Sequence, residues 1–501
     1  MTSDPARAVD LATLVAALDG ALVRGTLERK IAGLAHDSRS VKRGDAFVAL
    51  RGERSDGHAF LEGAIAAGAS ALFVESARFE SLALPAGVAV VGVPDTRRAL
   101  SRLASAFYGN PSQALAVAGI TGTNGKTTTS QLVAAILEAG GIPCGRIGTL
   151  GAHFGGAMWP LENTTPLALE LQATLAAMRD RGARAVAMEV SSHALALERV
   201  ADVAFEVAAL TNVTRDHLDF HGTLEAYAAA KRTLFDASRY SVFNADDSYG
   251  ARWTAEVAAQ GRPVMTYGLR GGAGFVPREL RLDAHGSSFE LHAQRFTLRL
   301  PGRFNVMNAL AAIAIASELG MDIATCARGL ASVEQVAGRM EHFGGAGIDV
   351  VVDYAHTPDA LHNVLEAVRE TAAGRVVVVF GCGGDRDRGK RSEMGRIASD
   401  LADAAVVTSD NPRTEDPQKI ADDIVRGFPA GRPATVELDR GAAIRAAIVC
   451  AQAGDVVVVA GKGHETYQIV GTNTLHFDDR DAVRAALAAR AALSGGRRVS
   501  T

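Results

Sequence analysis

Short apolar runs alternate with longer amphipathic stretches along most of the chain, and this pattern predicts an α/β protein. Apolar runs that end at glycine or at a polar residue are typical of buried parallel strands. Examples are "ALAVAGI", "RAVAMEV", "VAFEVAALTNV", "DVVVDYAH", "RVVVVFG", "DAAVVTSD" and "DVVVVAGKGHE". Between them, stretches such as "TSQLVAAILEAGG" and "LALELQATLAAMRDRG" have helical periodicity. This alternation predicts mostly parallel sheets covered by helices.

Two breaks in the pattern predict three domains, at residues 1–110, 111–338 and 339–501. The first break is "YGNPSQ" (108–113), where Gly, Asn, Pro and Ser cluster, and the second lies within "VEQVAGRMEHF" (333–343). Before the first break, "GDAFVALRG" predicts a strand and "HAFLEGAIAAGASALFVE" predicts a helix, a turn and a strand. The tail "LSGGRRVST" is expected to fray.

Composition excludes several classes of protein. A chain of 501 residues with 48% hydrophobic content can build more than one core, since single cores stop growing near ~250–300 residues. A net charge of -4 and 5% aromatic residues argue against a nucleic-acid or anionic-membrane surface. The four cysteines are far apart, which indicates reduced thiols and a cytoplasmic location. The sequence has neither a signal pattern nor an apolar run of ~18–20 residues.

The stretch "AVAGITGTNGKTTTSQL" predicts a phosphate-binding loop between a strand and a helix. Glycines let consecutive N–H groups face a phosphate, Lys126 adds a positive charge, and Thr127 offers a hydroxyl suited to Mg²⁺. The pattern departs from G-x-x-x-x-G-K-[ST], because Ile120 occupies the place of the first glycine. The alternative is a purely structural glycine turn, which the order of strand, turn and helix disfavours.

Polar residues follow other predicted strands, where α/β proteins place their ligand sites. Glu189 ends "RAVAMEV", and His217 follows "TNVTRD". Each residue alone could be an ordinary surface or capping group, but several strand-end groups beside a phosphate loop favour a site. Lys231, in "YAAAKRTLF", reads by itself as a solvated helix lysine.

The loop "TSDNPRTEDP" (408–417) also follows a strand, and it holds Arg413 among acidic residues. Pro412 fixes its own φ and restricts Asn411, so the turn is stiff. Asp410 and Asn411 can bind an amino group, and the planar guanidinium of Arg413 suits a carboxylate. The alternative is a solvated acidic turn.

Taken together, these motifs resemble the Mur ligase family, whose relatives are the folylpolyglutamate synthases. The loop "TGTNGKTT" carries the first resemblance. The others are "ENTTP", "MEVSSHAL", "TNVTRDHLDFHG", "YAAAKRTLF", "GRFNVMNALAA", "DYAHTPDAL", "FGCGGDRDRGKR", "DNPRTEDP" and "AGKGHETYQ". The resemblance covers about residues 30–480. Within the family, "DNPR" marks the branch that adds diaminopimelate.

The resemblance implies an ATP-dependent ligase with a central P-loop-type, mostly parallel sheet and a C-terminal Rossmann-like sheet. The three domains would bind a UDP-sugar, ATP and an amino acid, in that order. The implied substrates are UDP-N-acetylmuramoyl-L-alanyl-D-glutamate and meso-2,6-diaminopimelate, joined in peptidoglycan precursor synthesis. ATP and Mg²⁺ are the implied cofactors, and Lys231 would carry a CO₂-derived carbamate. We expect a monomer that binds neither nucleic acid nor membrane.

The resemblance also assigns site residues. The nucleotide contacts would be Gly122, Thr123, Asn124, Gly125, Lys126, Thr127, Thr128, Asn308, Arg339 and Asp353. The metal site would involve Thr127, Glu189, His217 and Lys231, and Lys126, His217 and Lys231 would be catalytic. The UDP-peptide would contact Ser38, Asn163, Thr164, Thr165, Ser191 and Arg199. The amino acid would contact Arg386, Asp410, Asn411, Pro412, Arg413, Gly461 and Glu465.

One departure and three alternatives qualify this interpretation. Some relatives have glutamine two residues before the matched arginine, where this chain has Leu197, so the polar contact of those relatives is not carried over to this position. A P-loop switch protein is disfavoured, because a guanine-reading N-K-x-D segment is absent. The same ligase using L-lysine is disfavoured, because L-lysine lacks the distal carboxylate that suits Arg413. A ligase with a different substrate, such as a folylpolyglutamate synthase or the next enzyme of the Mur family, is disfavoured by the front segment "HDSR" and the loop "DNPR".

Overall fold

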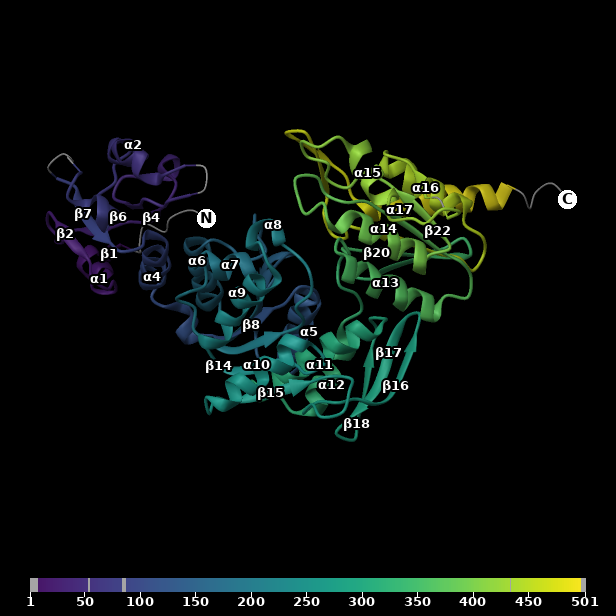
Figure 1. Ribbon diagram of the computed structural model, residues 1–501. Coiled ribbons are helices and arrows are strands. Elements are labelled where there is room, and N and C mark those ends of the chain that lie inside the picture. The colour runs from purple at the N-terminus through teal and green to yellow at the C-terminus, as the bar shows by residue number, and fades with distance from the viewer. Residues whose placement is uncertain (1–7, 53–54, 83–86, 433, 497–501) are drawn as a thin grey trace. The chain divides into compact units, whose positions relative to one another are not determined.

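The computed structural model describes residues 8–52, 55–82, 87–432 and 434–496. The internal contacts of the chain divide it into two compact units, and Figure 1 labels many of the helices and strands named below. The first comprises Met1–Thr121, Ile142–Ala208 and Ala230–Tyr240. The second comprises Gly122–Gly141, Ala209–Ala229 and Ser241–Thr501. The predicted phosphate loop therefore begins the second unit.

The first unit begins with a five-stranded sheet in the order β2-β7-β6-β5-β4, in which only β2 is antiparallel to its neighbour. One face packs against α1 and α4, and the other packs against α2. The predicted helix, turn and strand are α2 and β6, and "GDAFVALRG" contains β5. The bounds are α1 (Leu11–Ala16), β2 (Leu22–Arg24), β4 (Leu34–Ala35), β5 (Ala46–Val48), α2 (Leu61–Ala66), β6 (Ala71–Glu75), β7 (Ala89–Val93) and α4 (Thr96–Phe107).

The rest of the first unit is built on parallel strands β9, β12 and β8, which the antiparallel strands β10 and β11 extend. Glu189 is the last residue of β12 and pairs with Ile120 of β8, so the predicted strand-end position is confirmed. The bounds are β8 (Ala116–Thr121), β9 (Cys144–Gly148), β10 (Gly151–Phe154), β11 (Ala157–Trp159), α6 (Ala168–Asp180), β12 (Ala185–Glu189) and α7 (Ser192–Ala196).

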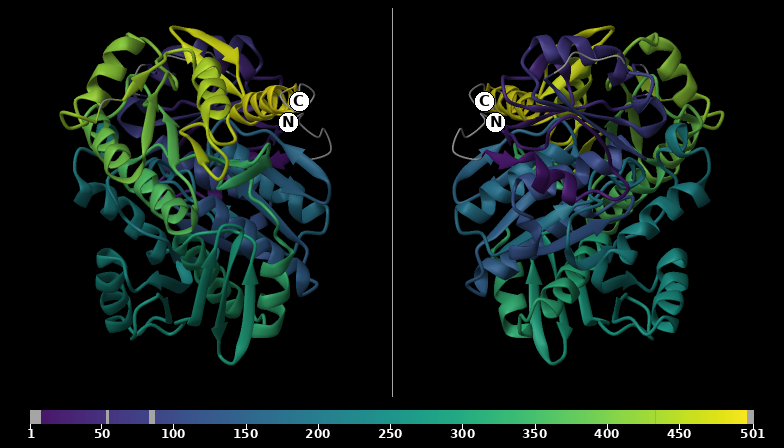
Figure 2. Two further views of the ribbon diagram at one scale, coloured as in Figure 1. Left: turned by 90° about the vertical axis from the view of Figure 1, so that its right-hand side faces the viewer. Right: turned by 90° about the vertical axis from the view of Figure 1, so that its left-hand side faces the viewer.

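In the second unit, helices α11 and α12 pack on the phosphate-loop helix α5. Residues of α11 are buried along almost its whole length, as expected for a central helix. A three-stranded antiparallel sheet, β16-β17-β18, follows α10 and β15 (Figure 2). The bounds are α5 (Lys126–Ala139), α10 (Ser248–Ala259), β15 (Val264–Tyr267), β16 (Arg278–Asp283), β17 (Gly286–Leu291), β18 (Gln294–Leu298), α11 (Arg303–Glu318) and α12 (Ile323–Ser332).

The C-terminal sheet has the order β19-β20-β24-β21-β22-β23, and every pair except β19–β20 is parallel. Alternate valines point to opposite faces. Val376, Val378 and Val458 pack with α13, α14 and α15, whereas Val377, Val379 and Val457 pack with α16 and α17. The Rossmann-like prediction is confirmed.

The bounds of these elements agree with the four predicted C-terminal strands. They are β19 (Glu341–Gly345), β20 (Ile348–Asp353), α13 (Pro358–Thr371), β21 (Val376–Phe380), α14 (Lys390–Leu401), β22 (Ala404–Val407), α15 (Pro417–Val425), β23 (Thr435–Val436), α16 (Arg440–Cys450) and β24 (Val456–Ala460).

A hairpin and a long helix complete the second unit. The hairpin joins β25 (Tyr467–Val470) to β26 (Asn473–His476), and α17 spans Asp479–Gly496. The tail expected to fray from Leu493 is helical as far as Gly496, and its last five residues lie outside the described ranges. None of the helices described is long and apolar enough to cross a membrane.

Candidate active site

The phosphate loop has the backbone that the sequence predicts. Gly122 and Gly125 have positive φ, at 147° and 88°. A side chain at Gly122 would collide with the Thr211 hydroxyl, and one at Gly125 would collide with the Asn308 amide, so both positions need glycine. Lys126 Nζ donates to the carbonyl oxygens of Gly122 and Thr123, both at 2.9 Å. The lysine is thus held over the loop at the N-terminus of α5.

The predicted nucleotide contacts outside the loop lie close to it in the second unit. Asn308 is buried beside Gly125, and its Nδ2 donates to Asn305 Oδ1 at 3.1 Å. Arg339 Nη2 donates to Thr127 Oγ1 at 3.1 Å. Its guanidinium also lies 4.5 Å from the centre of the Tyr354 ring. The structure therefore brings Asn308 and Arg339 to the loop.

Asp353 ends β20 and is buried. Its carboxylate accepts hydrogen bonds from the backbone N–H groups of Met340 and Ala355, each at 2.7 Å. Burial raises the pKa of this carboxyl, and Arg339 and the two N–H groups oppose that effect. The carboxylate thus fixes the turn that carries Arg339.

A second group, at the start of α13, also reaches the loop. Asp359 Oδ2 accepts a hydrogen bond of 2.7 Å from Asn124 Nδ2, and Asn124 N donates to Asn212 Oδ1 at 2.9 Å. Sequence reasoning missed Asp359 and Asn212. A sequence signal was available, because both lie within motifs already matched, "DYAHTPDAL" and "TNVTRDHLDFHG".

In the first unit, four of the predicted UDP-peptide contacts, Thr164, Thr165, Ser191 and Arg199, belong to one hydrogen-bond network around Glu189. Thr165 Oγ1 donates to Glu189 O at 2.9 Å and accepts from Ser191 N at 3.0 Å. Arg199 Nη1 donates to Thr165 O at 3.0 Å, and burial lowers the pKa of this arginine. Thr149 N and Thr149 Oγ1 donate to the two Glu189 carboxylate oxygens at 2.9 and 3.0 Å.

Thr164 belongs to the same network, since its hydroxyl lies 3.2 Å from that of Thr149. Thr149 is a contact that sequence reasoning missed. Leu197 caps the C-terminus of α7, where its backbone N–H bonds to the carbonyl of His193.

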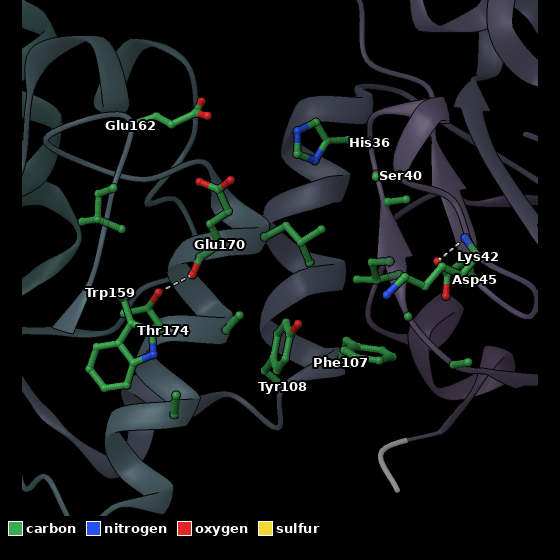
Figure 3. A pocket seen from close by; sticks show the side chains of 18 of the residues that line it. His36, Ser40, Lys42, Asp45, Phe107, Tyr108, Trp159, Glu162, Glu170 and Thr174 are labelled. Carbon is green, nitrogen blue, oxygen red and sulfur yellow. Dashed lines mark hydrogen bonds between the residues drawn. The ribbon is translucent and has the colours of Figure 1, made fainter. Parts of the chain in front are cut away.

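A cavity of about 1030 Å³ lies beside this network in the first unit (Figure 3). Its walls come from the segment that resembles the uridine-binding region, including His36, Ser40 and Lys42, and from β11 and α6. His36 and Glu170 project into the cavity from opposite walls (Figure 3). Burial lowers the pKa of His36, and the Glu170 carboxylate partly opposes this. The predicted contact Ser38 begins a 3-10 turn, two residues before Ser40.

The other predicted metal-site residues are placed as follows. His217 has a positive φ of 52°, and its Nε2 lies 3.3 Å from Asp216 Oδ2. Lys231 is 1% exposed, so the expectation of a solvated lysine from its sequence context alone is wrong. No group of three or more His, Cys, Asp or Glu side chains within the described ranges is arranged as a metal site.

The predicted amino-acid contacts gather at the carboxyl ends of β21, β22 and β24. Asp410 and Asn411 are buried, and Asn411 Nδ2 donates to Glu465 Oε2 at 3.1 Å. Gly461 has φ of 119°, and a side chain there would approach Asp410 Oδ2 to 2.8 Å. Burial and the neighbouring Asp410 raise the pKa of Glu465, and Lys462 opposes this.

Arg413 adopts a positive φ of 52°, which a non-glycine residue rarely does without a reason. Its Nη1 donates to Gly384 O at 2.8 Å. Its backbone N–H and C=O bond to Ile469 and Gly471 of the hairpin. Arg386 lies on the same turn as Gly384, is exposed, and donates to Asp385 O. The two arginines therefore flank one glycine turn.

The chain therefore has three candidate binding features. They are the phosphate loop around Lys126, Glu189 with its threonine neighbours at the end of β12, and the loop that carries Asp410, Asn411 and Arg413. Comparisons with known proteins identify relatives with the same plan. The chain matches the Mur ligase middle domain over residues 120–316, the Mur ligase glutamate ligase domain over 338–463, and the Mur ligase family catalytic domain over 30–108.

Two curated relatives have the same printed name, UDP-N-acetylmuramoyl-L-alanyl-D-glutamate--2,6-diaminopimelate ligase. The relative from Gloeobacter violaceus is 49% identical over 470 residues, which is 92% of this chain and 94% of the relative. The relative from Syntrophomonas wolfei is 44% identical over 483 residues, 94% of this chain and 97% of the relative. A solved structure of a ligase with that name is 35% identical, with a TM-score of 0.67 and coverage of 96% and 99% of the two chains.

Proposed function

The chain belongs to the Mur ligase family, and from this premise we propose that it is an ATP-dependent ligase. It adds meso-2,6-diaminopimelate to the D-glutamate γ-carboxylate of UDP-N-acetylmuramoyl-L-alanyl-D-glutamate. The reaction belongs to peptidoglycan precursor synthesis in the cytoplasm, and the enzyme acts as a monomer. The observation that carries this proposal is the cluster of Asp410, Asn411, Arg413 and Glu465 at the strand ends of the C-terminal sheet.

The chemistry of that cluster suits an amino acid with a second amino-acid group at its far end. The carboxylate oxygens of Asp410 and Glu465 can accept from an ammonium group, and the Asn411 amide donates to Glu465 and holds it in place. The guanidinium groups of Arg413 and Arg386 can bind a carboxylate in bidentate fashion. L-Lysine has the distal amine but lacks the distal carboxylate, so it would leave this guanidinium pair without its anion.

The reaction proceeds in two steps, phosphoryl transfer and amide formation. A γ-carboxylate oxygen attacks the γ-phosphorus of ATP, the bond to the bridging oxygen breaks, and ADP leaves. The amine of diaminopimelate then attacks the acyl carbon, loses a proton and expels inorganic phosphate. Lys126, which lies over the loop, offsets charge on the transferred phosphoryl group. Gly122, Thr123, Asn124, Gly125 and Thr128 cradle the phosphates, Asn308 faces the adenine, and Arg339 and Asp353 contact phosphate and ribose.

Mg²⁺ would be held by Thr127 and Glu189, with His217 assisting a second ion, since oxygen donors suit this hard cation. When bound, it neutralises charge on the phosphate oxygens. Lys231 carries a carbamate in this proposal. Lys231 is buried. A carbamate is an anion that can bind or orient a cation, whereas an ammonium group would repel it.

The UDP-peptide binds in the first unit. Its uridine binds at Ser38, and its muramoyl-peptide binds at Asn163, Thr164, Thr165, Ser191 and Arg199. The cavity in Figure 3 supports this assignment, because the uridine-type segment and the residues that precede Asn163 share its walls. We assign UDP-sugar binding to residues 1–110, ATP binding to residues 111–338 and amino-acid binding to residues 339–501.

A ligation assay tests the proposal. The enzyme is incubated with ATP, Mg²⁺ and the UDP-dipeptide, together with meso-diaminopimelate, L-lysine, D-alanyl-D-alanine or L-glutamate in turn. We expect release of ADP and phosphate, with a UDP-tripeptide product, for meso-diaminopimelate. Release of ADP without any added amine, or equal turnover with L-lysine, would contradict the assignment.

A further inference from the structure

Lys462 lies in the centre of the amino-acid cluster and is inaccessible to solvent, with an exposure of 0%. It follows Gly461 directly after β24. Its Nζ donates to Asn411 Oδ1 at 3.0 Å and to the carbonyl oxygen of Tyr467 at 2.7 Å. The carboxylates of Asp410 and Glu465 each lie 3.5 Å from the same nitrogen. One ammonium group thus contacts three of the proposed amino-acid ligands.

The hydrogen bonds around Lys462 fix the orientation of Asn411. Asn411 Oδ1 accepts from both Lys462 Nζ and Ile469 N, the second at 2.9 Å. With its oxygen held in this way, the amide must turn its Nδ2 donors towards Glu465. Gln468 Nε2 donates to Asp410 O at 2.8 Å and secures the other end of the loop. A substitution that removed Lys462 Nζ would take away one of the two donors that fix the Asn411 amide and leave Ile469 N alone to hold it.

The charge of the cluster also depends on Lys462. The carboxylates of Asp410 and Glu465 flank the single ammonium group of Lys462, and burial together with the neighbouring Asp410 raises the pKa of Glu465. The lysine offsets one negative charge and leaves one to receive an ammonium group. The nearby Arg440 already pairs with Asp479, at 2.7 Å, and therefore cannot take over this role without breaking that pair.

We propose that Lys462 is a positioning residue for amino-acid selection: it holds Asp410, Asn411 and Glu465 in one charged, oriented cluster that binds the ammonium group of the incoming amino acid. The inference rests on the proposed function. It adds a residue that contacts the side chains proposed to bind the amino acid and does not contact the amino acid itself. A buried lysine that served the fold alone would affect stability and leave amino-acid affinity unchanged.

The test compares wild type, Lys462→Met, which keeps the length of the stem and removes the charge, and Lys419→Met as a matched control. Lys419 is exposed on α15 in the same sheet domain. We expect Lys462→Met to raise the KM for diaminopimelate at least about tenfold, the usual effect of losing one charged hydrogen bond. The KM values for ATP and the UDP-dipeptide, and all constants of Lys419→Met, should stay within about threefold of wild type.

A second measurement on the wild type covers the possibility that Lys462→Met does not fold. The charged and polar groups that face Glu465 are Asp410, Asn411, Lys462, Tyr354, Tyr467 and Arg440. A carboxyl with a raised pKa loses its charge as pH falls through that pKa, so the lysine must keep Glu465 ionised for ammonium binding to persist. We expect the Kd for diaminopimelate, with UDP-dipeptide and a non-hydrolysable ATP analogue present, to vary by less than about threefold from pH 7.5 to pH 6.

Two outcomes would overturn the inference. One is a folded Lys462→Met enzyme with the wild-type KM for diaminopimelate. The other is a wild-type Kd that weakens tenfold or more over that pH range. Failure of the proposed function looks different, because the wild-type enzyme would then show no diaminopimelate-dependent ADP release at all.

Discussion

Lys126 is the residue on which the phosphoryl-transfer proposal depends most directly. Its Nζ already contacts two loop carbonyls, so little rearrangement is needed to meet a phosphate. We expect Lys126→Ala to lower kcat by about a hundred-fold or more, the scale of losing one preorganised charge contact. Steady-state ADP release measures this, and circular dichroism checks that the variant folds. Near-normal turnover would remove the phosphate-loop assignment.

Lys231 is buried, although its sequence context alone suggests a solvated lysine. The proposed carbamate on Lys231 can be tested by substitution. We expect Lys231→Ala to be nearly inactive and Lys231→Arg to give no rescue, because arginine keeps a positive charge and cannot form a carbamate. Added bicarbonate should raise wild-type activity wherever carbamylation is incomplete, and it should not change either variant. Equal activity of wild type and Lys231→Arg would rule out the carbamate.

Substitution of Arg413 tests the proposed amino-acid specificity. A site built to pair a polar group rejects a ligand that lacks the group by roughly 10⁴. We expect wild type to prefer meso-diaminopimelate over L-lysine by several orders of magnitude in kcat/KM, and Arg413→Ala to lose most of that preference. The kcat/KM ratio of the two amino acids measures it. Comparable wild-type values would refute the interpretation of the "DNPR" loop.

Sequence reasoning located these residues because strand-end positions and motif letters are local properties. Glu189 ends a strand and Asn411 lies in a proline-stiffened turn, and both facts are visible in a window of ten letters. The burial of Lys462 and Lys231 is not local. The lysine in "GKGHE" cannot be told from an exposed lysine by its sequence, because its burial depends on β22 and β24, which bring Asn411 to a hydrogen bond with it and the Asp410 carboxylate to 3.5 Å.

At the scale of the elements, the starts of α16 and α17 are joined by a buried ion pair. Arg440 Nε and Nη2 donate to the two Asp479 oxygens, both at 2.7 Å, and neither side chain is exposed. We expect Asp479→Ala to lower the free energy of unfolding by about 3–5 kcal/mol, because it leaves the buried Arg440 guanidinium without its carboxylate partner. Urea unfolding measures this.

Asp481→Ala is the matched control on the same helix. Its ion pair with Arg484 is more than half exposed on both sides, so the expected change is within about 0.5 kcal/mol. Equal destabilisation by Asp479→Ala and Asp481→Ala would show that burial does not determine how much the Arg440–Asp479 ion pair contributes to the free energy of unfolding.

The elements also show where periodicity succeeds and where it does not. The valine runs predicted β20, β21, β22 and β24, since a strand covered on both faces is continuously apolar. The insertion of β24 between β20 and β21 could not be predicted, because strand order depends on contacts far apart in sequence. The antiparallel strands β16, β17 and β18 were missed, although their alternating polar and apolar residues are typical of a sheet with one buried face.

At the scale of the whole molecule, the proposed ligands are distributed between the two units. The residues proposed to bind the UDP-peptide belong to the first unit, and the predicted phosphate loop and the proposed amino-acid cluster belong to the second. The γ-carboxylate must reach both the phosphorus and the amine, so the proposed reaction requires the three ligands to lie within bonding distance of one another. Closure around ligands is the usual solution to this requirement.

We therefore expect the radius of gyration to decrease when all ligands are bound. Small-angle scattering would compare the free protein with samples that contain the UDP-dipeptide alone, an ATP analogue alone, and both with diaminopimelate. The full set should give the most compact protein, since only then are the contacts of all three ligands present to shift the population towards a closed state. Lys126→Ala serves as the control, because a weakened phosphate contact should reduce the compaction by nucleotide and leave the free protein unchanged. Identical scattering in every state would mean that the three ligands meet in a site that is already assembled.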